Sequence, residues 1–128
     1  MGRVLVIDDD PTIRSLAAGL LESRGHSLVQ AVDGRAGIAL FSKENFDLVV
    51  TDIVMPEQEG IETITAIRRA NRTVPILAIS GSSTIGGSGD YLRAAAALGA
   101  SATLQKPFGP DDFVDAVEKL LAGPSRTT

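Results

Sequence analysis

Five short apolar runs alternate with segments of helical periodicity, and this alternation constrains the fold more than any other feature of the sequence. The first, third and fourth runs are almost continuously apolar, which indicates strands buried on both faces, as in a parallel sheet. Right-handed crossovers between successive strands place helices on both faces of such a sheet. We therefore predict a single α/β domain, a doubly wound (βα)5 unit. Its expected strands are residues 4–7, 28–31, 48–51, 76–80 and 102–105.

Between the expected strands, apolar residues recur every three or four positions, as on the buried face of a helix. Residues 61–67 indicate the third helix, and an alanine-rich segment at 91–98 is expected to form the fourth. The first helix is expected to begin at Pro11, because proline suits the first helical position and Asp10 can cap the helix.

The length of 128 residues suits one domain, which we expect to cover residues 1–122 and to end in a flexible tail at 123–128. The chain has no cysteine, which excludes disulfides and thiolate metal sites and agrees with a cytoplasmic location. Its net charge of −4 argues against direct binding of nucleic acid, which needs a basic face. The first apolar run is too short for a membrane span or a signal peptide.

Polar and charged residues gather where the expected strands end. Asp8 and Asp9 follow the first strand, Asp52 follows the third, Ser80 ends the fourth and Lys106 follows the fifth. In an open parallel sheet, ligands bind outside the carboxyl ends of the strands. Carboxylates from two strands form a hard oxygen site that suits Mg²⁺, and a lysine beside it can hold a phosphoryl group. The sequence therefore predicts a site for Mg²⁺ and phosphate at this edge.

Residues 3–122 resemble the receiver domain of bacterial two-component response regulators. The resemblance rests on four stretches in a fixed order, namely VLVIDDDPTIR, DLVVTDIVMPEQEG, PILAISG and LQKPF. No one of them is decisive alone, but each contains an expected strand end, and their order and separations make the combined signal strong. The resemblance implies a flavodoxin-like or CheY-like sheet with the strand order 2-1-3-4-5.

The resemblance also implies a role for each residue of the site. Asp52 would be the phosphoacceptor, and Ser80 would be a switch hydroxyl that bonds the phosphoryl group. Lys106 would neutralise that group. Asp9, Asp52 and the backbone carbonyl of Val54 would bind Mg²⁺, and Asp8 would act through a coordinated water.

A receiver of this kind would be a signalling switch rather than a turnover enzyme on an external substrate. Its phosphodonor would be a histidine kinase or a histidine phosphotransfer protein. Its downstream protein target would bind the face formed by the fourth helix, the fifth strand and the fifth helix, and phosphorylation could also promote a dimer through that face. The sequence leaves open whether the receiver works alone or within a larger regulator.

Two features depart from the receiver pattern. Receivers commonly carry an aromatic switch residue three positions before the lysine, where this chain has Thr103. The segment 81–89, GSSTIGGSG, is also longer than usual and rich in glycine and serine, so activation here could order a loose loop.

Two other functions fit parts of the pattern. Asp8 to Thr12 also fits the D-x-D-x-T motif of haloacid-dehalogenase-like phosphatases, in which Asp8 would be the nucleophile. Against this reading, the first helix leaves no room for the flap of those enzymes, and their final acidic pair would fall on Asp111 and Asp112, which open a helix. The other alternative is a receiver scaffold that is not phosphorylated.

Several residues have a simpler interpretation. The only histidine, His26, lies away from the expected site, and we expect it to be a surface residue. A phosphodonor histidine would lie on an exposed helix face, so this chain is expected to receive phosphate rather than donate it. The arginines Arg68, Arg69 and Arg72 are expected to form a solvated helix end, where positive charge suits the helix dipole.

Overall fold

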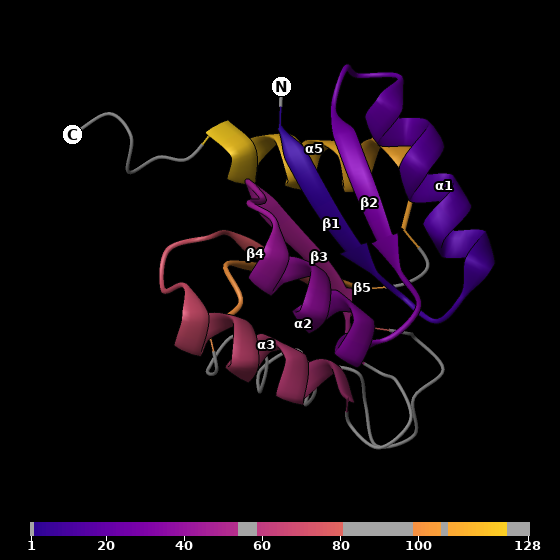
Figure 1. The fold of residues 1–128 in the computed structure, drawn as a ribbon. Coiled ribbons are helices and arrows are strands. Elements are labelled where there is room, and N and C mark those ends of the chain that lie inside the picture. Colours follow the sequence, from indigo (N-terminus) through magenta and orange to yellow (C-terminus); the bar gives the residue numbers. More distant parts are fainter. Residues whose placement is uncertain (1, 54–58, 81–98, 106–107, 123–128) are drawn as a thin grey trace.

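The computed structural model describes residues 2–53, 59–80, 99–105 and 108–122. Five parallel strands form one sheet in the order β2-β1-β3-β4-β5, which confirms the predicted topology (Figure 1). The segments 81–89, 91–98 and 123–128, for which we predict a loop, a helix and a tail, lie outside the described residues. The strands are β1 (Arg3–Ile7), β2 (Ser27–Ala31), β3 (Leu48–Asp52), β4 (Ile76–Ser80) and β5 (Ala102–Gln105).

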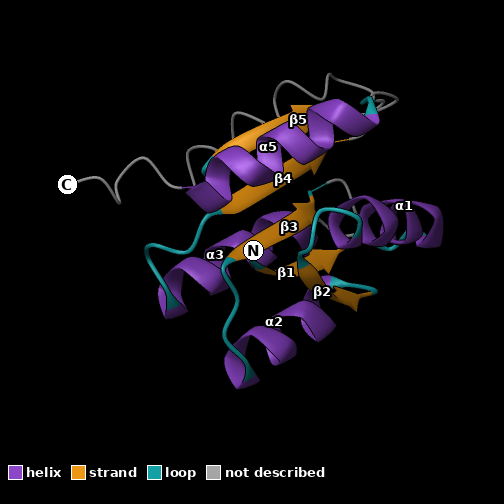
Figure 2. Ribbon diagram, turned by 90° about the horizontal axis from the view of Figure 1, so that it is seen from above, coloured by secondary structure: helices purple, strands orange, loops and turns teal. Residues whose placement is uncertain are grey.

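Four described helices cover the two faces of the sheet. Helices α2 and α3 pack on one face, and α1 and α5 pack on the other, so that the sheet forms a middle layer (Figure 2). The helices are α1 (Pro11–Glu22), α2 (Gly34–Lys43), α3 (Glu59–Ala70) and α5 (Pro110–Ala122).

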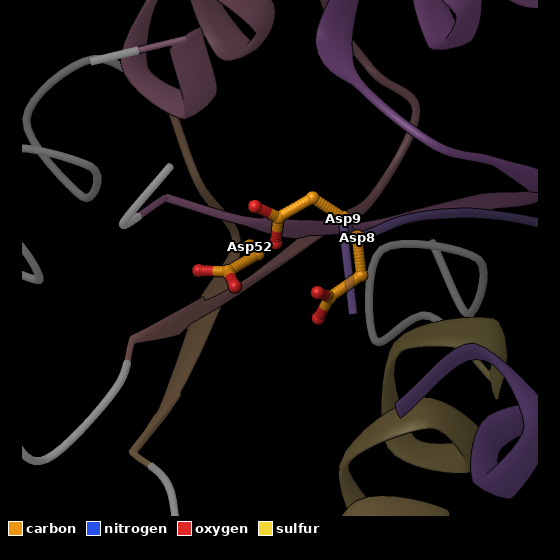
Figure 3. A group of neighbouring side chains, drawn as sticks. All are labelled: Asp8, Asp9 and Asp52. Atoms are coloured by element: carbon orange, nitrogen blue, oxygen red, sulfur yellow. The ribbon is translucent and has the colours of Figure 1, made fainter. Parts of the chain in front are cut away.

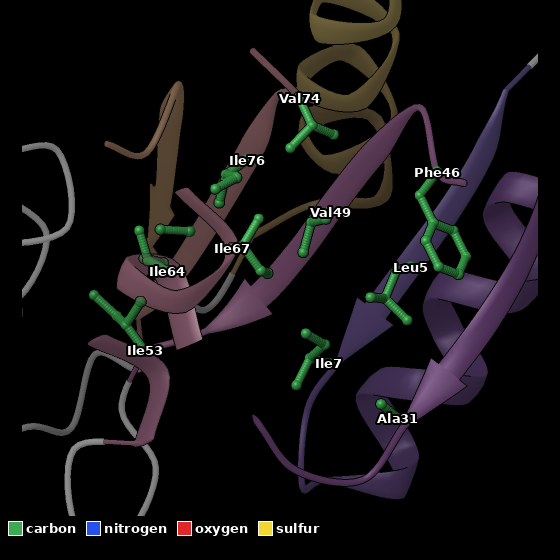
Figure 4. Packing of buried hydrophobic residues seen from close by; sticks show 11 residues of the cluster. Leu5, Ile7, Ala31, Phe46, Val49, Ile53, Ile64, Ile67, Val74 and Ile76 are labelled. Atoms are coloured by element: carbon green, nitrogen blue, oxygen red, sulfur yellow. The ribbon is translucent and has the colours of Figure 1, made fainter. Parts of the chain in front are cut away.

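The apolar runs are continuous because each strand supplies side chains to both layers. In β1, Leu5 and Ile7 belong to the cluster beneath α2 and α3 (Figure 4), whereas Val4 and Val6 belong to the cluster beneath α1 and α5. All four side chains are at most 1% exposed. Burial of both faces is what makes the central strands apolar at every position.

Helix caps fix the connections at the carboxyl ends of β1 and β2. The Asp10 carboxylate accepts a hydrogen bond from the Thr12 N–H at 2.9 Å and caps α1, with Pro11 at the first helical position, as predicted. Asp33 caps α2 in the same way by accepting from the Ala36 N–H at 2.8 Å.

Helix α2 approaches β1 closely at Gly37, which has room for no side chain. A Cβ atom at this position would overlap with Cδ1 of Ile7 and would lie 2.7 Å from its Cγ1. We expect Gly37→Ala to lower the free energy of unfolding in urea by about 1–3 kcal/mol, because overpacking forces side chains or backbone to shift. The matched control is Gly19→Ala in α1, where nothing lies within 4 Å of the added Cβ atom. That change should raise stability by about 0.5–1 kcal/mol, and equal effects of the two changes would contradict the close approach.

The prediction that His26 is a surface residue was wrong. Its side chain is only 7% exposed. Nδ1 accepts a hydrogen bond from the Gly2 N–H at 3.0 Å, and Nε2 lies 3.3 Å from a carboxylate oxygen of Glu118 in α5. The imidazole therefore joins the start of the chain to α5.

The prediction of a solvated helix end was wrong for Arg68, although Arg69 and Arg72 are exposed as expected. The Arg68 guanidinium donates to the carbonyl of Val74 at 2.6 Å and to that of Gly99 at 2.9 Å. Burial lowers the pKa of Arg68. This side chain ties the end of α3 to the segments that lead into β4 and β5.

Within the described ranges, no helix combines the length and the apolar character that crossing a membrane requires.

Candidate functional site

The register of the sheet brings three aspartates to one edge. Residue Ile7 of β1 pairs with Thr51 of β3, so Asp8, the next residue, lies level with Asp52. Asp9 follows directly and begins the connection to α1. The adjacency of β1 and β3 in the sheet therefore positions all three carboxylates at the carboxyl ends of the central strands.

The three side chains lie close together (Figure 3). Each of Asp8, Asp9 and Asp52 offers a carboxylate oxygen, and these oxygens all lie within 4.8 Å of one another. Asp8 is 1% exposed and Asp52 is 4% exposed, whereas Asp9 is open to solvent. The structure thus forms an acidic cluster with two buried members and one exposed member.

Such a cluster needs compensating positive charge. Two carboxylates about 4 Å apart repel each other by roughly 4 kcal/mol at an effective dielectric constant of 20. A donor set made only of carboxylate oxygens is hard and suits Mg²⁺, which is bound through one or two carboxylates and keeps several waters. Because Asp9 is exposed, water can reach the cluster, and the residues present fit a Mg²⁺ site.

Hydrogen bonds to Asp8 hold the start of the connection in place. Its N–H donates to the carbonyl of Ala31 in β2 at 3.1 Å, and its Oδ1 accepts from the Asp10 N–H at 2.9 Å. Its carbonyl accepts from Nη1 of Arg14 at 2.7 Å. The sequence patterns described above do not indicate a role for Arg14. The available signal was a cation near the start of a helix, where the helix dipole disfavours positive charge.

Of the other predicted site residues, the structure describes Ser80 and Thr103 but not Val54 and Lys106. Ser80 ends β4, the strand next to β3, and its backbone pairs with Gln105 of β5. Gln105 directly precedes Lys106 in the sequence, but Lys106 and Val54 lie outside the described residues. Thr103 lies on β5 at the edge of the sheet and is exposed.

The acidic pair that the phosphatase alternative requires does not end a strand. Asp111 and Asp112 lie in the first turn of α5. The Asp112 carboxylate accepts from the Gly109 N–H at 3.3 Å, which is a helix-capping role. Helix α1 begins at Pro11, so only two residues separate it from Asp8, and this connection is too short for the flap of those phosphatases.

Residues 4–118 match the family described as the response regulator receiver domain. The chain belongs to this family. It is 35% identical over 123 residues to the DNA-binding dual master transcriptional regulator RpaA of Synechocystis. The match covers 94% of this chain and 49% of RpaA. The chain therefore spans about half the length of this relative.

Solved receiver structures share the fold. The chemotaxis protein CheY4 of Vibrio cholerae is 30% identical with a TM-score of 0.83, and the match covers 94% of this chain and 98% of CheY4. A response regulator receiver domain from Clostridium thermocellum is 25% identical with a TM-score of 0.88 and full coverage of both chains.

Membership of the receiver family relates the acidic cluster to a known type of metal site. Receiver domains generally bind Mg²⁺ at an acidic pocket, and those of response regulators interact with kinases and downstream targets. The chain is thus a receiver domain of a two-component system, with a signalling role. None of the similarities favours the phosphatase alternative.

Proposed function

We propose that this receiver accepts a phosphoryl group on Asp52 from a phosphohistidine of a histidine kinase or a histidine phosphotransfer protein. The observation that carries the proposal is the position of Asp52 in a member of the receiver family. Its side chain is buried, and one of its carboxylate oxygens lies within 4.8 Å of carboxylate oxygens of Asp8 and Asp9. In the transfer, a carboxylate oxygen of Asp52 forms a bond to phosphorus while the bond between phosphorus and the donor imidazole nitrogen breaks. The imidazole is the leaving group.

The environments of the three aspartates support different roles for them. Asp52 ends β3, a strand that lies between β1 and β4, and Asp52 itself pairs with Ile79 of β4, which suits an acceptor whose position must be fixed. One Asp8 oxygen already accepts from the Asp10 N–H, which suits contact with an ion through water. Asp9 is exposed and is available as a direct ligand.

Asp9, Asp52 and the carbonyl of Val54 would hold Mg²⁺, as in other receivers. The ion would supply positive charge to the oxygens of the incoming phosphoryl group, since phosphoryl transfer depends largely on positioning and electrostatic stabilisation. Ser80 is the last residue of β4, and Lys106 is the next residue in the sequence after β5. We therefore propose that these two side chains bind the remaining phosphoryl oxygens.

The output would pass through protein contacts at the face that contains β5 and α5. A cavity of about 420 Å³ opens there between Ala102 and Leu104 of β5 and Leu120 of α5, and it offers a partner an apolar recess beside charged side chains. A downstream target, or a second phosphorylated copy, would bind this face in the cytoplasm. Because Thr103 replaces the usual aromatic residue, switching would not involve movement of a ring.

Intact-protein mass spectrometry after incubation with acetyl phosphate tests the proposal. The wild type should gain one phosphoryl group in the presence of Mg²⁺ and none in EDTA, and Asp52→Asn should gain none. Asp8→Asn should be labelled more slowly, because it keeps the acceptor. Labelling that persists in Asp52→Asn and is lost in Asp8→Asn would instead support the phosphatase alternative.

Labelling with a phosphorylated histidine phosphotransfer domain distinguishes a receiver from a scaffold. The proposed function predicts transfer from this donor to the wild type and none to Asp52→Asn. If neither donor labels the wild type in Mg²⁺, the result favours the receiver scaffold that is not phosphorylated or a receiver that needs a different donor, and titration with Mg²⁺ would follow.

A further inference from the structure

Arg14 contacts the acidic cluster through the backbone rather than through a carboxylate. Its half-buried side chain lies near the start of α1, and Nη1 donates to the Asp8 carbonyl at 2.7 Å. Its own N–H donates to the Asp10 carbonyl at 3.1 Å in the first turn of the helix. Within the described part of the chain, Arg14 forms no ion pair. Among these residues, the hydrogen bond to the Asp8 carbonyl is the contact that holds its guanidinium.

The charge of Arg14 would compensate the metal-free carboxylates, but it does not favour the binding of a metal ion. A cation at the start of a helix opposes the helix dipole, and a cation near a divalent metal ion repels it. A role as a simple point charge would therefore weaken a Mg²⁺ site. The hydrogen bond to Asp8 indicates a different role.

The carbonyl that Arg14 binds belongs to the peptide that joins Asp8 to Asp9. The Asp8 N–H is held by Ala31 of β2, and the Asp8 carboxylate is held by the Asp10 N–H. The Arg14 bond fixes the remaining polar group of Asp8. The orientation of this peptide determines where the Asp9 side chain begins, and therefore whether its carboxylate reaches Asp52.

We propose that Arg14 is a positioning residue that holds the Asp8–Asp9 peptide so that the Asp9 carboxylate joins Asp52 in binding Mg²⁺. This inference rests on the proposed function, because it assigns the cluster to the metal ion. Groups that orient metal ligands commonly change metal affinity by about 10–100-fold when they are removed. Arg14 acts one peptide away from the ligand, so a change of about tenfold is expected.

Isothermal titration with MgCl₂ alone measures the effect without any phosphorylation. Arg14→Gln should raise the Kd for Mg²⁺ about tenfold, and Arg14→Lys, which keeps a charged donor, should restore part of the affinity. The matched control is Arg35→Gln, which removes an exposed positive charge from α2, a helix that begins at the same edge of the sheet. Its Kd should stay within about twofold of the wild type.

The direction of the change in the Kd for Mg²⁺ distinguishes a positioning role of Arg14 from a purely electrostatic one. If Arg14 acts only as a point charge, Arg14→Gln will bind Mg²⁺ more tightly than the wild type and Arg14→Lys will be unchanged, which would overturn the inference. An unchanged Kd in Arg14→Gln would also overturn it and would leave the proposed function intact. If the wild type itself does not bind Mg²⁺, the proposed metal site fails together with the role of Arg14. Thermal unfolding in EDTA checks that each variant is folded.

Discussion

Replacing Asp9 by asparagine is expected to stabilise the metal-free protein and to remove most of its affinity for Mg²⁺. The Asp9 oxygen lies within 4.8 Å of oxygens of Asp8 and Asp52, so the change relieves two repulsions. Because Asp9 is exposed, solvent screens these repulsions, and the gain in the free energy of unfolding in EDTA should be about 1 kcal/mol. The loss of a charged ligand should raise the Kd for Mg²⁺ by about a hundredfold.

The matched control is Asp10→Asn, which removes the same charge one residue further along. Asp10 caps α1 and is not part of the cluster, and asparagine caps helices as well as aspartate does. We expect little change in stability or in Mg²⁺ affinity, as measured by urea unfolding in EDTA and by titration with MgCl₂. Equal effects of the two changes would show that net charge, and not the cluster, determines the binding of the ion.

Replacing Phe113 by alanine is expected to cause the largest loss of stability. Phe113 is 2% exposed, and its ring stacks on Phe108 with the centroids 5.6 Å apart. It belongs to the cluster between the sheet and helices α1 and α5. Truncation of a buried phenylalanine removes its transfer free energy and leaves a cavity, so the free energy of unfolding in urea should fall by about 3–5 kcal/mol.

Leu16→Ala in α1 serves as the comparison, because Leu16 is 40% exposed on the same layer of the protein. Its effect should be within about 0.5 kcal/mol of zero, as for most surface substitutions. A loss below about 1 kcal/mol for Phe113→Ala would contradict the packing of α5 against the sheet.

The sequence predicted the sheet and the location of the site because both depend on local patterns. Continuous apolarity in runs such as residues 4–7 reflects burial on both faces, and the order of strands and helices then places Asp8 and Asp52 at one edge. Capping of α1 by Asp10 was also predictable, since the capping residue and the proline are adjacent in the chain.

The contacts that sequence analysis missed join residues that are distant in sequence or depend on side-chain direction. The His26 side chain is largely covered because Glu118, 92 residues later, and Gly2 both contact its ring. Arg68 looked like part of a solvated helix end, but its guanidinium reaches carbonyls that follow the helix, including that of Gly99, 31 residues later. Arg14 is close to Asp8 in sequence, yet only the turn at Asp10 directs its side chain back to the Asp8 carbonyl. No periodicity encodes such contacts.

Reduction of the phosphorylated protein with borohydride tests the central claim most directly. An aspartyl phosphate is reduced to homoserine, whereas an ordinary aspartate is not, so peptide mass spectrometry can identify the acceptor. After incubation with acetyl phosphate and Mg²⁺, we predict homoserine at position 52 and none in the peptide that contains Asp8 and Asp9. Homoserine at position 8 or 9, or a stable phosphoryl group that borohydride does not remove, would contradict the assignment of Asp52 as the phosphoacceptor.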